Sequence, residues 1–500
     1  MAADNQALGR SVRIGLALTG SADSLRHLLE FSTGIVLARL LMPSDFGIIA
    51  VVSSFMQISY VVGNFGMAGA IVQAETLEDG DCHTATAVST AVAGLLTLAG
   101  IVFAPQAAAF FSMPVLADVM PIMAVQITLA GISSIPLALL RRDFRFGRVA
   151  IVESGGAAIY ASIGISLALS GYGVWSLVWA PLGSAVWILA SSTALAGYVP
   201  LPVLNRESVA KLWRFGSGLT LKNVFVYIGR NVDNFIVARA LGDAATGVYN
   251  RAFNLTRMPQ TRLVGILYRV CFPAFCRLRD DRPRFHDWYL RATTAVAVGI
   301  TPLLLGLGSV AGDFTVAVLG EQWSDMIIPL QILCVSALIS CLHTLGGAAI
   351  EATGRVHYEV YTQSTYSVLV VVGCLIGTQW GINGVAVGVL GASISLYAMK
   401  AFTIRAATGL PISSYISAVV PSVLAGIVMS AVVIAYRATD FAPDDIWLRL
   451  FSSIAIGAVT YPIALALIAR EHLRLVFTQG RLIFSRNSDT SAGERIEAPS

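Results

Sequence analysis

The sequence predicts an all-α polytopic membrane protein with about 14 transmembrane helices: two six-helix lobes in a parallel pseudo-repeat, plus two C-terminal helices. Two of the three observations behind this prediction concern composition: 56% of the 500 residues are hydrophobic, and only 12% are charged. The third is that apolar runs of about 20 residues or more recur from end to end. With a mean hydropathy of +0.74, the chain carries more apolar surface than a water-soluble domain can bury. The membrane part is therefore expected to be the whole protein.

The apolar runs place the spans in order along the chain, each closed by charged residues, glycine or proline. The predicted spans are 14–39, 46–72, 84–111, 115–140, 149–170, 172–198, 212–240, 248–275, 288–310, 326–350, 357–378, 382–405, 412–436 and 446–469. We group them as an N-terminal six-helix lobe (1–205), a C-terminal six-helix lobe (206–408), two additional helices (409–470) and a cytoplasmic tail (471–500).

The basic loops predict the orientation, because Lys and Arg are retained on the cytoplasmic side. Three loops on one side of the predicted topology are basic: Arg141, Arg142, Arg145 and Arg148; Arg206, Lys211 and Arg214; Arg277, Arg279, Arg282 and Arg284. The opposite loops carry acids such as Asp45, Asp118 and Asp313. Both termini are therefore expected in the cytoplasm.

An internal repeat predicts the two lobes. Ala38-Arg39-Leu40-Leu41 followed by Gly47 returns 200 residues later as Ala238-Arg239-Ala240-Leu241 followed by Gly247. Gly147-Arg148-Val149 and Gly173-Val174 return in the same order as Gly354-Arg355-Val356 and Gly384-Val385. Six spans separate the copies, so both lobes have the same orientation, and a substrate site is expected between them.

Polar residues concentrate on the first two spans of each lobe, where charged groups at membrane depth normally face a cavity or each other. Asp23, Arg26, His27 and Glu30 share one face of the first span, because they are three or four residues apart. We predict a central cavity with these substrate-binding candidates: Arg26, Lys222, Arg230, Arg251, Arg257, Arg262, Gln57, Asn64 and Asn254. The ion-coupling candidates are Asp23, Glu30 and Asp233.

The excess of arginine in this set predicts an anionic substrate, because guanidinium groups match phosphate and carboxylate oxygens. A second interpretation stays open for each residue: Asp23 with Arg26, or Glu30 with His27, could be ion pairs that lock helices together. His343 and Glu351 are interpreted as local helix contacts rather than ligands.

Several classes of function are excluded by what the chain lacks. It contains no Walker loop, GxSxG or HExxH motif, so we predict neither an enzyme nor an ATP-driven pump. The six cysteines have no CxxC spacing and no metal-ligand cluster is present, so no metal or cofactor is expected. The net charge of +4 reflects loop Arg and Lys and does not indicate nucleic acid.

Four stretches resemble the polysaccharide-biosynthesis flippases. They are LARLLMPSDFGIIA (Leu37–Ala50), NFGMAGAIVQ (Asn64–Gln73), RRDFRFGRVA (Arg141–Ala150) and LGEQWSDMIIPLQIL (Leu319–Leu333). These flippases are the Wzx-type exporters of the multidrug/oligosaccharidyl-lipid/polysaccharide exporter superfamily, and the likeness is greatest to the exopolysaccharide repeat-unit branch. It runs from about Arg13 to about Arg405.

The resemblance implies a two-lobed bundle with a V-shaped cavity that opens to alternate faces of the membrane. It also implies that the substrate is an undecaprenyl-pyrophosphate-linked oligosaccharide, whose lipid stays in the bilayer. The implied partners are the lipid bilayer and the polymerase and chain-length machinery of the same pathway, and we expect a monomer. The alternatives left open are a lipid II flippase, a multidrug or ion antiporter of the same superfamily, and, from another class, a membrane-embedded glycan polymerase.

Overall fold

The computed structural model describes residues 24–63, 67–73, 79–201 and 206–472. Every regular element in these ranges is a helix. Nine helical stretches among them are long and apolar enough to cross a membrane, and one of the nine, residues 356–408, contains two of the predicted spans. The prediction of an all-α polytopic membrane protein is therefore confirmed.

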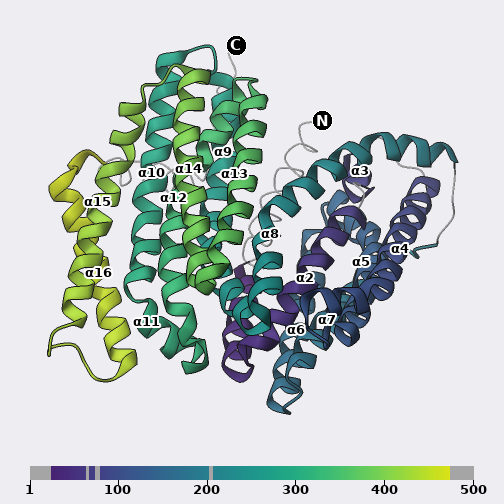
Figure 1. The fold of residues 1–500 in the computed structure, drawn as a ribbon. Helices are drawn as coiled ribbons and strands as arrows, with labels where there is room; N and C mark the ends of the chain where they lie inside the picture. The colour runs from purple at the N-terminus through teal and green to yellow at the C-terminus, as the bar shows by residue number, and fades with distance from the viewer. Residues whose placement is uncertain (1–23, 64–66, 74–78, 202–205, 473–500) are drawn as a thin grey trace, which may run out of the picture. The chain divides into compact units, whose positions relative to one another are not determined.

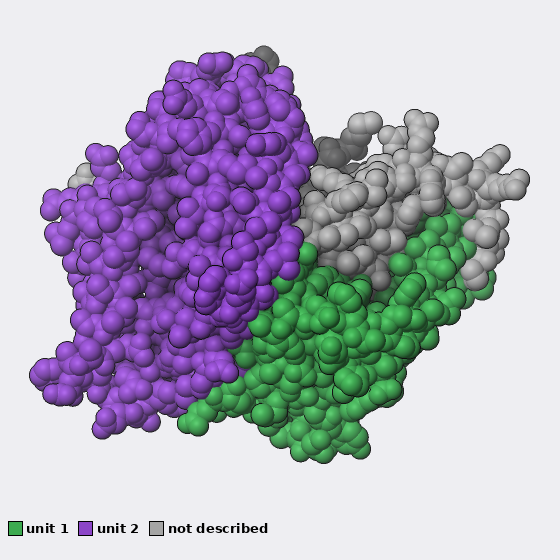
Figure 2. Space-filling model, in the orientation of Figure 1, with its two compact units in different colours: residues 1–251, 318–322 green, residues 252–317, 323–500 purple. Residues whose placement is uncertain are grey.

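The chain divides into two compact units, which are coloured separately in Figure 2. Unit 1 comprises residues 1–251 and 318–322, and unit 2 comprises residues 252–317 and 323–500. Unit 1 extends to Arg251 because the chain before this residue packs on the N-terminal helices, as described below. The predicted boundary between the two lobes, at residues 205 and 206, is based on the sequence repeat and stays a prediction.

Unit 1 begins with a helix over residues 24–40, which is followed by six labelled helices and most of a seventh (Figure 1). These are α2 (Pro43–Gly63), α3 (Met67–Gln73), α4 (Asp79–Phe111), α5 (Leu116–Arg142), α6 (Phe146–Leu169), α7 (Val174–Ala196) and α8 (Arg206–Pro259). A buried apolar cluster that includes Val51, Met56, Phe111, Met123 and Ala238 joins α2, α4, α5 and α8.

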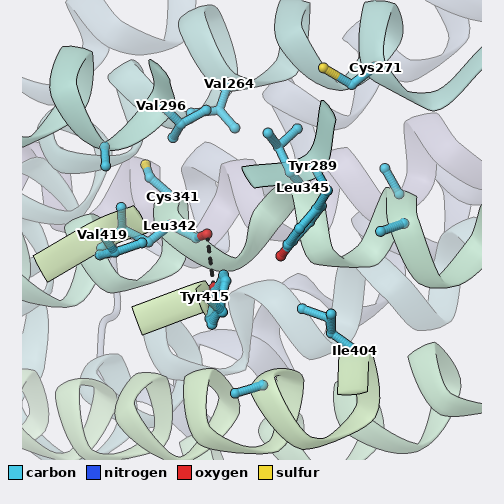
Figure 3. Packing of buried hydrophobic residues seen from close by; sticks show 14 of the residues in the cluster. Val264, Cys271, Tyr289, Val296, Cys341, Leu342, Leu345, Ile404, Tyr415 and Val419 are labelled. Atoms are coloured by element: carbon cyan, nitrogen blue, oxygen red, sulfur yellow. Dashed lines mark hydrogen bonds between the residues drawn. The ribbon is translucent and has the colours of Figure 1, made fainter. Parts of the chain in front are cut away.

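Unit 2 contains the remaining helices, and Figure 1 shows α10, α12, α13 and α14 running along one another in it. The long helices are α9 (Gly265–Leu278), α10 (Arg282–Ser309), α12 (Ile327–Ala352), α13 (Val356–Gly377), α14 (Gly381–Thr408), α15 (Ile412–Arg437) and α16 (Ile446–Ile468). Short turns connect them: η1 (Gln260–Val264), α11 (Ala311–Phe314), η2 (Thr315–Leu319), η3 (Glu321–Met326) and η4 (Thr378–Trp380). Figure 3 shows part of the core, where Tyr415 donates a hydrogen bond to the Leu342 carbonyl oxygen, with a distance of 3.2 Å.

The predicted spans match these helices within a few residues over most of the chain. The first, second, seventh and eighth predicted spans correspond to the helix over 24–40, to α2 and to α8 with its continuation. These segments are not among the nine stretches found in the described residues. These are the helices that carry the polar side chains. The break inside α8 lies at Gly242, whose φ of 86° and ψ of −174° interrupt the helix. A side chain is disfavoured at this φ, which explains the glycine between the two spans.

Close packing in unit 2 depends on glycine where α13 crosses α14. A Cβ added to Gly377 would overlap the carbonyl of Gly384, and one added to Gly384 would overlap the carbonyl of Gly377. Gly373 and Gly388 face each other in the same way. Small residues four apart allow two helix backbones to approach this closely in a membrane. These four glycines are therefore packing residues.

The last two helices are attached to unit 2 by a buried carboxylate. Asp313 in α11 is 5% exposed, and its oxygens lie 2.8 Å from Arg437 Nε of α15 and 3.1 Å from a guanidinium nitrogen of Arg449 in α16. Two cations around one buried carboxylate satisfy a charge that would be costly alone. This cluster therefore helps to hold α15 and α16 against the bundle.

Candidate functional site

The repeated glycines Gly47 and Gly247 pack against each other's segment in unit 1. A Cβ added to Gly47, in α2, would overlap the backbone of Asp243. A Cβ added to Gly247, in α8, would overlap the carbonyl of Pro43 and come within 2.9 Å of the Gly47 nitrogen. Gly47 thus lies against Asp243, which is four residues before Gly247, and Gly247 lies against Pro43, which is four residues before Gly47. We call this reciprocal contact between the two copies of the motif the glycine crossing.

Each repeated arginine contacts the opposite repeat: Arg239 contacts the last turn of α4, the third span, and Arg39 contacts η2, which follows the ninth span. Arg39 Nε donates a hydrogen bond of 2.9 Å to the carbonyl oxygen of Val318. Arg239 has its guanidinium over the ring of Phe110, 5.5 Å from the ring centroid. Gln322 adds hydrogen bonds to the carbonyl oxygens of Ala38 and Arg39, at 3.1 and 3.2 Å. These contacts explain why residues 318–322 belong to unit 1 rather than to the helices around them in sequence.

An aromatic triangle lies below the glycine crossing in unit 1. Phe55 of α2 is 5.1 Å from Phe235 of α8 between ring centroids, and Phe111 of α4 is 6.3 Å from Phe55. Asp45 lies beside the crossing, at the start of α2, and its carboxylate accepts a hydrogen bond of 3.0 Å from the Met42 N–H. Burial raises the pKa of Asp45, while the backbone hydrogen bonds from Met42 and Val174 lower it and the charge of Asp243 raises it further.

The polar candidates that fall in α8 within unit 1 make specific contacts. Asp233 is buried and accepts a hydrogen bond of 2.9 Å from the Tyr249 hydroxyl, across the break at Gly242. Arg251 donates to the Gly34 carbonyl oxygen at 2.6 Å and lies over the ring of Phe46. The structure thus brings Arg251 to the first two helices, where it packs beside the crossing.

The candidates on the first helix belong to an ion-pair network. Arg26 lies 3.3 Å from a carboxylate oxygen of Glu30 and 3.8 Å from one of Glu153 in α6. Glu153 also pairs with Arg141, and His27 lies 3.1 Å from Glu30. Two arginines and two glutamates compensate each other here. Of the two pairs considered from the sequence, Glu30 with His27 is present within the first helix, whereas Asp23 lies outside the described residues. The contact that joins two helices is the one between Arg26 and Glu153, and an anionic ligand would compete with two carboxylates for Arg26.

The structure places the remaining candidates separately. Gln57 in α2 and Asn254 in α8 are exposed, and the Arg257 guanidinium lies 5.1 Å from the ring centroid of Phe253. Asn254 and Arg257 belong to unit 2, whereas Arg26, Glu30, Gln57, Asp233 and Arg251 belong to unit 1. The predictions for Asp23 and Asn64, and for the side chains of Lys222, Arg230 and Arg262, lie outside the described residues.

Sequence reasoning missed an ion pair in unit 2, although it named Glu351 as a local helix contact. The Lys400 side chain of α14 is 2% exposed and forms a salt bridge with Glu359 of α13. On the neighbouring α12, Glu351 accepts a hydrogen bond of 2.6 Å from the Tyr268 hydroxyl of α9. Lys400 within an apolar span was the available signal, because a lysine at membrane depth requires a partner.

Metal chemistry has no support in the part of the chain that the structure describes. No group of three or more His, Cys, Asp or Glu side chains lies close enough there to hold a metal ion. Five of the six cysteines, all except Cys276, are buried. Their burial within apolar helices agrees with packing roles.

Residues 36–328, more than half of the chain, match the family model of the polysaccharide biosynthesis proteins. The chain belongs to this family. The matched region starts in the first helix and includes both copies of the motif that forms the glycine crossing. The resemblance to Wzx-type polysaccharide flippases is thereby confirmed.

Similar proteins of known name span nearly the same length. The succinoglycan biosynthesis transport protein ExoT of Rhizobium meliloti is 26% identical over 93% of this chain and 95% of its own length. The lipopolysaccharide biosynthesis protein WzxC of Escherichia coli is 25% identical over 71% of this chain and 73% of its own. The teichuronic acid biosynthesis protein TuaB of Bacillus subtilis is 23% identical over 84% of this chain and 88% of its own.

Solved structures share the fold. The lipid II flippase MurJ, in an inward closed conformation, superimposes with a TM-score of 0.74 at 14% identity, over 91% of this chain and all of that one. An inward-facing multidrug resistance transporter of the MATE family gives a TM-score of 0.59 at 16% identity, over 77% of this chain and 96% of that one. The chain therefore shares the fold of these two proteins. The family match and the named relatives identify it as a transporter of polysaccharide biosynthesis and confirm the prediction that it is not an enzyme.

Proposed function

We propose that this protein flips undecaprenyl-pyrophosphate-linked oligosaccharide repeat units across the bacterial inner membrane for exopolysaccharide synthesis. Transport would proceed by alternating access through a cationic central cavity, with both termini in the cytoplasm. The family match carries the proposal, and the names of the relatives, which refer to succinoglycan, lipopolysaccharide and teichuronic acid, support an oligosaccharide as the cargo. The protein would act as a monomer beside the polymerase and chain-length machinery of its pathway.

The arginine side chains support an anionic head group as the part of the substrate that the protein recognises. Arg257 has a guanidinium held over Phe253, and Arg230 and Arg262 are further cations of the same polar helices. Guanidinium groups bind phosphate oxygens with paired hydrogen bonds. A pyrophosphate supplies such oxygens, whereas an organic cation carried by a multidrug antiporter would require carboxylates and aromatic faces instead.

The glycine crossing supports alternating access, because it brings the two copies of the repeated motif into contact within unit 1. Four of its contacts end on backbone carbonyl oxygens or on an aromatic face, and none of these four is an ion pair. Net hydrogen-bond energies of about 1 kcal/mol each make such a closure reversible. In this proposal the crossing is the closed barrier on the outer side, where the predicted topology places Asp45.

Deletion of the gene in its own bacterium separates this proposal from its chief alternative. We expect exopolysaccharide to disappear from the medium and the lipid-linked repeat unit to accumulate in the membrane, while growth and lipid II levels stay normal. Thin-layer chromatography of extracted polyprenyl lipids gives both quantities. Arrested growth with accumulated lipid II would instead identify a lipid II flippase, and unchanged polymer would contradict a role in export.

A further inference from the structure

A cationic pocket lies at one end of the unit 2 bundle, where the ends of several helices meet. Its volume is about 280 Å³, and its wall comes from the turn before α10, the turn before α13 and the last turn of α14. The charged side chains of the wall are those of Arg279, Arg282, Arg355 and Asp280. Three positive charges and one negative charge leave the wall with a net charge of +2.

The negative charge of the wall is already paired. Asp280 lies 3.4 Å from Arg279 Nε, and both side chains are largely exposed. In the part of the chain that the structure describes, no carboxylate lies within ion-pair distance of Arg282 or Arg355. A nitrogen of the Arg282 guanidinium lies instead over Gly409, 3.6 Å from a Cβ added there. Two guanidinium groups of the pocket therefore have no anion beside them.

Arg355 has a structural role that the repeat explains. It donates a hydrogen bond to the carbonyl oxygen of Ala406, and its copy in the first repeat, Arg148, donates one of 2.6 Å to the carbonyl oxygen of Leu195. In both repeats an arginine at the start of one helix thus holds the end of the next helix, α6 with α7 and α13 with α14. A guanidinium group has five N–H donors, so this contact leaves Arg355 donors for a ligand.

The repeat does not explain Arg282. The third helix of each repeat begins on the same predicted side of the membrane, as α4 in unit 1 and as α10 in unit 2. The first turn of α4 carries Asp79 and Asp81, whereas the first turn of α10 carries Arg282 and Arg284. The fold therefore accepts acids at this place, and the cationic wall is a feature of unit 2 alone.

Exposed aromatic side chains indicate the depth of the pocket in the membrane. Trp288 of α10 is 50% exposed and follows Arg282 by six residues, and Phe402 of α14 is 65% exposed and precedes Thr408 of the pocket wall by six residues. Six residues span about 9 Å of helix. Tryptophan is enriched where the hydrocarbon of a bilayer meets its head groups. The pocket thus lies at the level of the head groups, on the side that the predicted topology places in the cytoplasm.

We propose that this pocket binds the phosphate of an anionic phospholipid from the cytoplasmic leaflet, and that Arg282 and Arg355 hold the phosphate oxygens. Guanidinium groups form paired hydrogen bonds with phosphate. Basic pockets between transmembrane helices on the cytoplasmic side have the charge that lipid head groups require. The bound phosphate bridges the start of α10 and the turn before α13, and so it joins two helices of unit 2 that no ion pair joins here.

The size of the pocket agrees with a head group rather than a whole lipid. Its volume corresponds to about nine water molecules and is below the usual range for pockets that enclose drug-sized ligands. The acyl chains of the lipid therefore stay in the bilayer. This lipid is a component of the membrane and not the cargo, so the inference goes beyond the proposed function and does not depend on it.

Protection of a cysteine in the pocket wall tests the proposal. The full-length protein with Thr353→Cys is reconstituted into phosphatidylcholine vesicles with or without phosphatidylglycerol, and the rate of labelling by N-ethylmaleimide, which crosses membranes, is measured. The same protein without Thr353→Cys gives the background from Cys276, the native cysteine that is not buried. We expect phosphatidylglycerol to slow the labelling. Inorganic phosphate added to phosphatidylcholine vesicles should leave the rate unchanged, because it has no acyl chains to hold it at the membrane.

Arg282→Gln and Arg284→Gln are matched variants for this measurement. Both remove one positive charge from the first turn of α10, but Arg284 pairs with Asp281 at 3.4 Å and does not line the pocket. In Arg282→Gln, the phosphatidylglycerol content that halves the labelling rate should rise about tenfold or more, because a hydrogen bond to a charged group is lost. Arg284→Gln should behave as the wild type.

Three results would overturn the proposal. They are an unchanged labelling rate of the Thr353→Cys protein in phosphatidylglycerol vesicles, an equal response of the Arg282→Gln and Arg284→Gln variants, and protection by inorganic phosphate equal to that by phosphatidylglycerol. The second result would show that the overall surface charge, rather than the pocket, attracts the lipid. The third would show that the pocket takes a soluble anion. Each readout is independent of export, so failure of the proposed transport function leaves this test intact.

Discussion

Gly247→Ala is expected to abolish polymer export while the protein still inserts into the membrane. The added methyl group would overlap the carbonyl of Pro43 and approach the Gly47 nitrogen, so the glycine crossing could not close as it does here. Overpacking of a tight contact costs about 1 to 3 kcal/mol. A cost of this size shifts a two-state equilibrium by about fivefold to about 150-fold toward the state in which the crossing is open.

Two measurements follow the consequences of Gly247→Ala. Export is measured as polymer released by the deletion strain that carries the variant gene. Opening is measured with the variant Val51→Cys, as the rate at which a membrane-impermeant maleimide labels the introduced cysteine. Val51 follows Gly47 by one helical turn, and its native side chain is 1% exposed. Labelling should accelerate in the Gly247→Ala background. Gly94→Ala in α4, where an added Cβ meets nothing within 4 Å, is the control. Wild-type export together with an unchanged labelling rate would show that the glycine crossing does not open and close during transport.

Arg257→Ala is expected to lower export by about tenfold to a hundredfold, with a normal amount of inserted protein. A hydrogen bond to a charged group contributes about 1.5 to 3 kcal/mol, and the variant removes such bonds to the pyrophosphate. Phe253 would still lie in place, because it precedes Arg257 by one turn of the same helix. Arg230→Ala should have a similar effect. Polymer released by the complemented deletion strain gives the size of the loss.

The control for Arg257 removes an arginine whose charge is already compensated. Arg291 in α10 is about half exposed and pairs with Asp287 at 2.8 Å, so Arg291→Ala changes the net charge equally but should leave export unchanged. Equal export from both variants would argue against a cationic cavity. Equal loss from both would indicate that total charge, rather than the position of Arg257, determines export.

Hydropathy and span length were sufficient to predict the helices of this protein, because each membrane-crossing segment must satisfy its own backbone hydrogen bonds. For this reason predicted spans such as 412–436 agree with α15 to within a residue. The break in α8 was predicted only to within a few residues. The helix breaks at Gly242, where the backbone has a positive φ. The seven residues between the two predicted spans also contain Gly247, which is helical, so the sequence alone did not show at which glycine the helix breaks.

Equivalence in a repeat does not predict contact between the equivalent residues. The sequence paired Gly47 with Gly247 and Arg39 with Arg239, but only the structure shows that each glycine lies against the opposite copy. The same limit applies to charged side chains. Arg26 and Glu153 are far apart in sequence and meet in space, as do Lys400 and Glu359. Helical periodicity gives the face on which a residue lies, not the helix that this face meets.

Flipping by the purified protein in proteoliposomes tests the central claim most directly. The vesicles contain the undecaprenyl-pyrophosphate-linked repeat unit extracted from the deletion strain, or lipid II for comparison, and an added enzyme modifies only the oligosaccharide exposed on the outer leaflet. Our account predicts that the protein makes nearly all of the repeat-unit lipid accessible, that protein-free vesicles expose only the outer-leaflet share, and that lipid II stays protected. Equal accessibility of the repeat-unit lipid with and without the protein would contradict it.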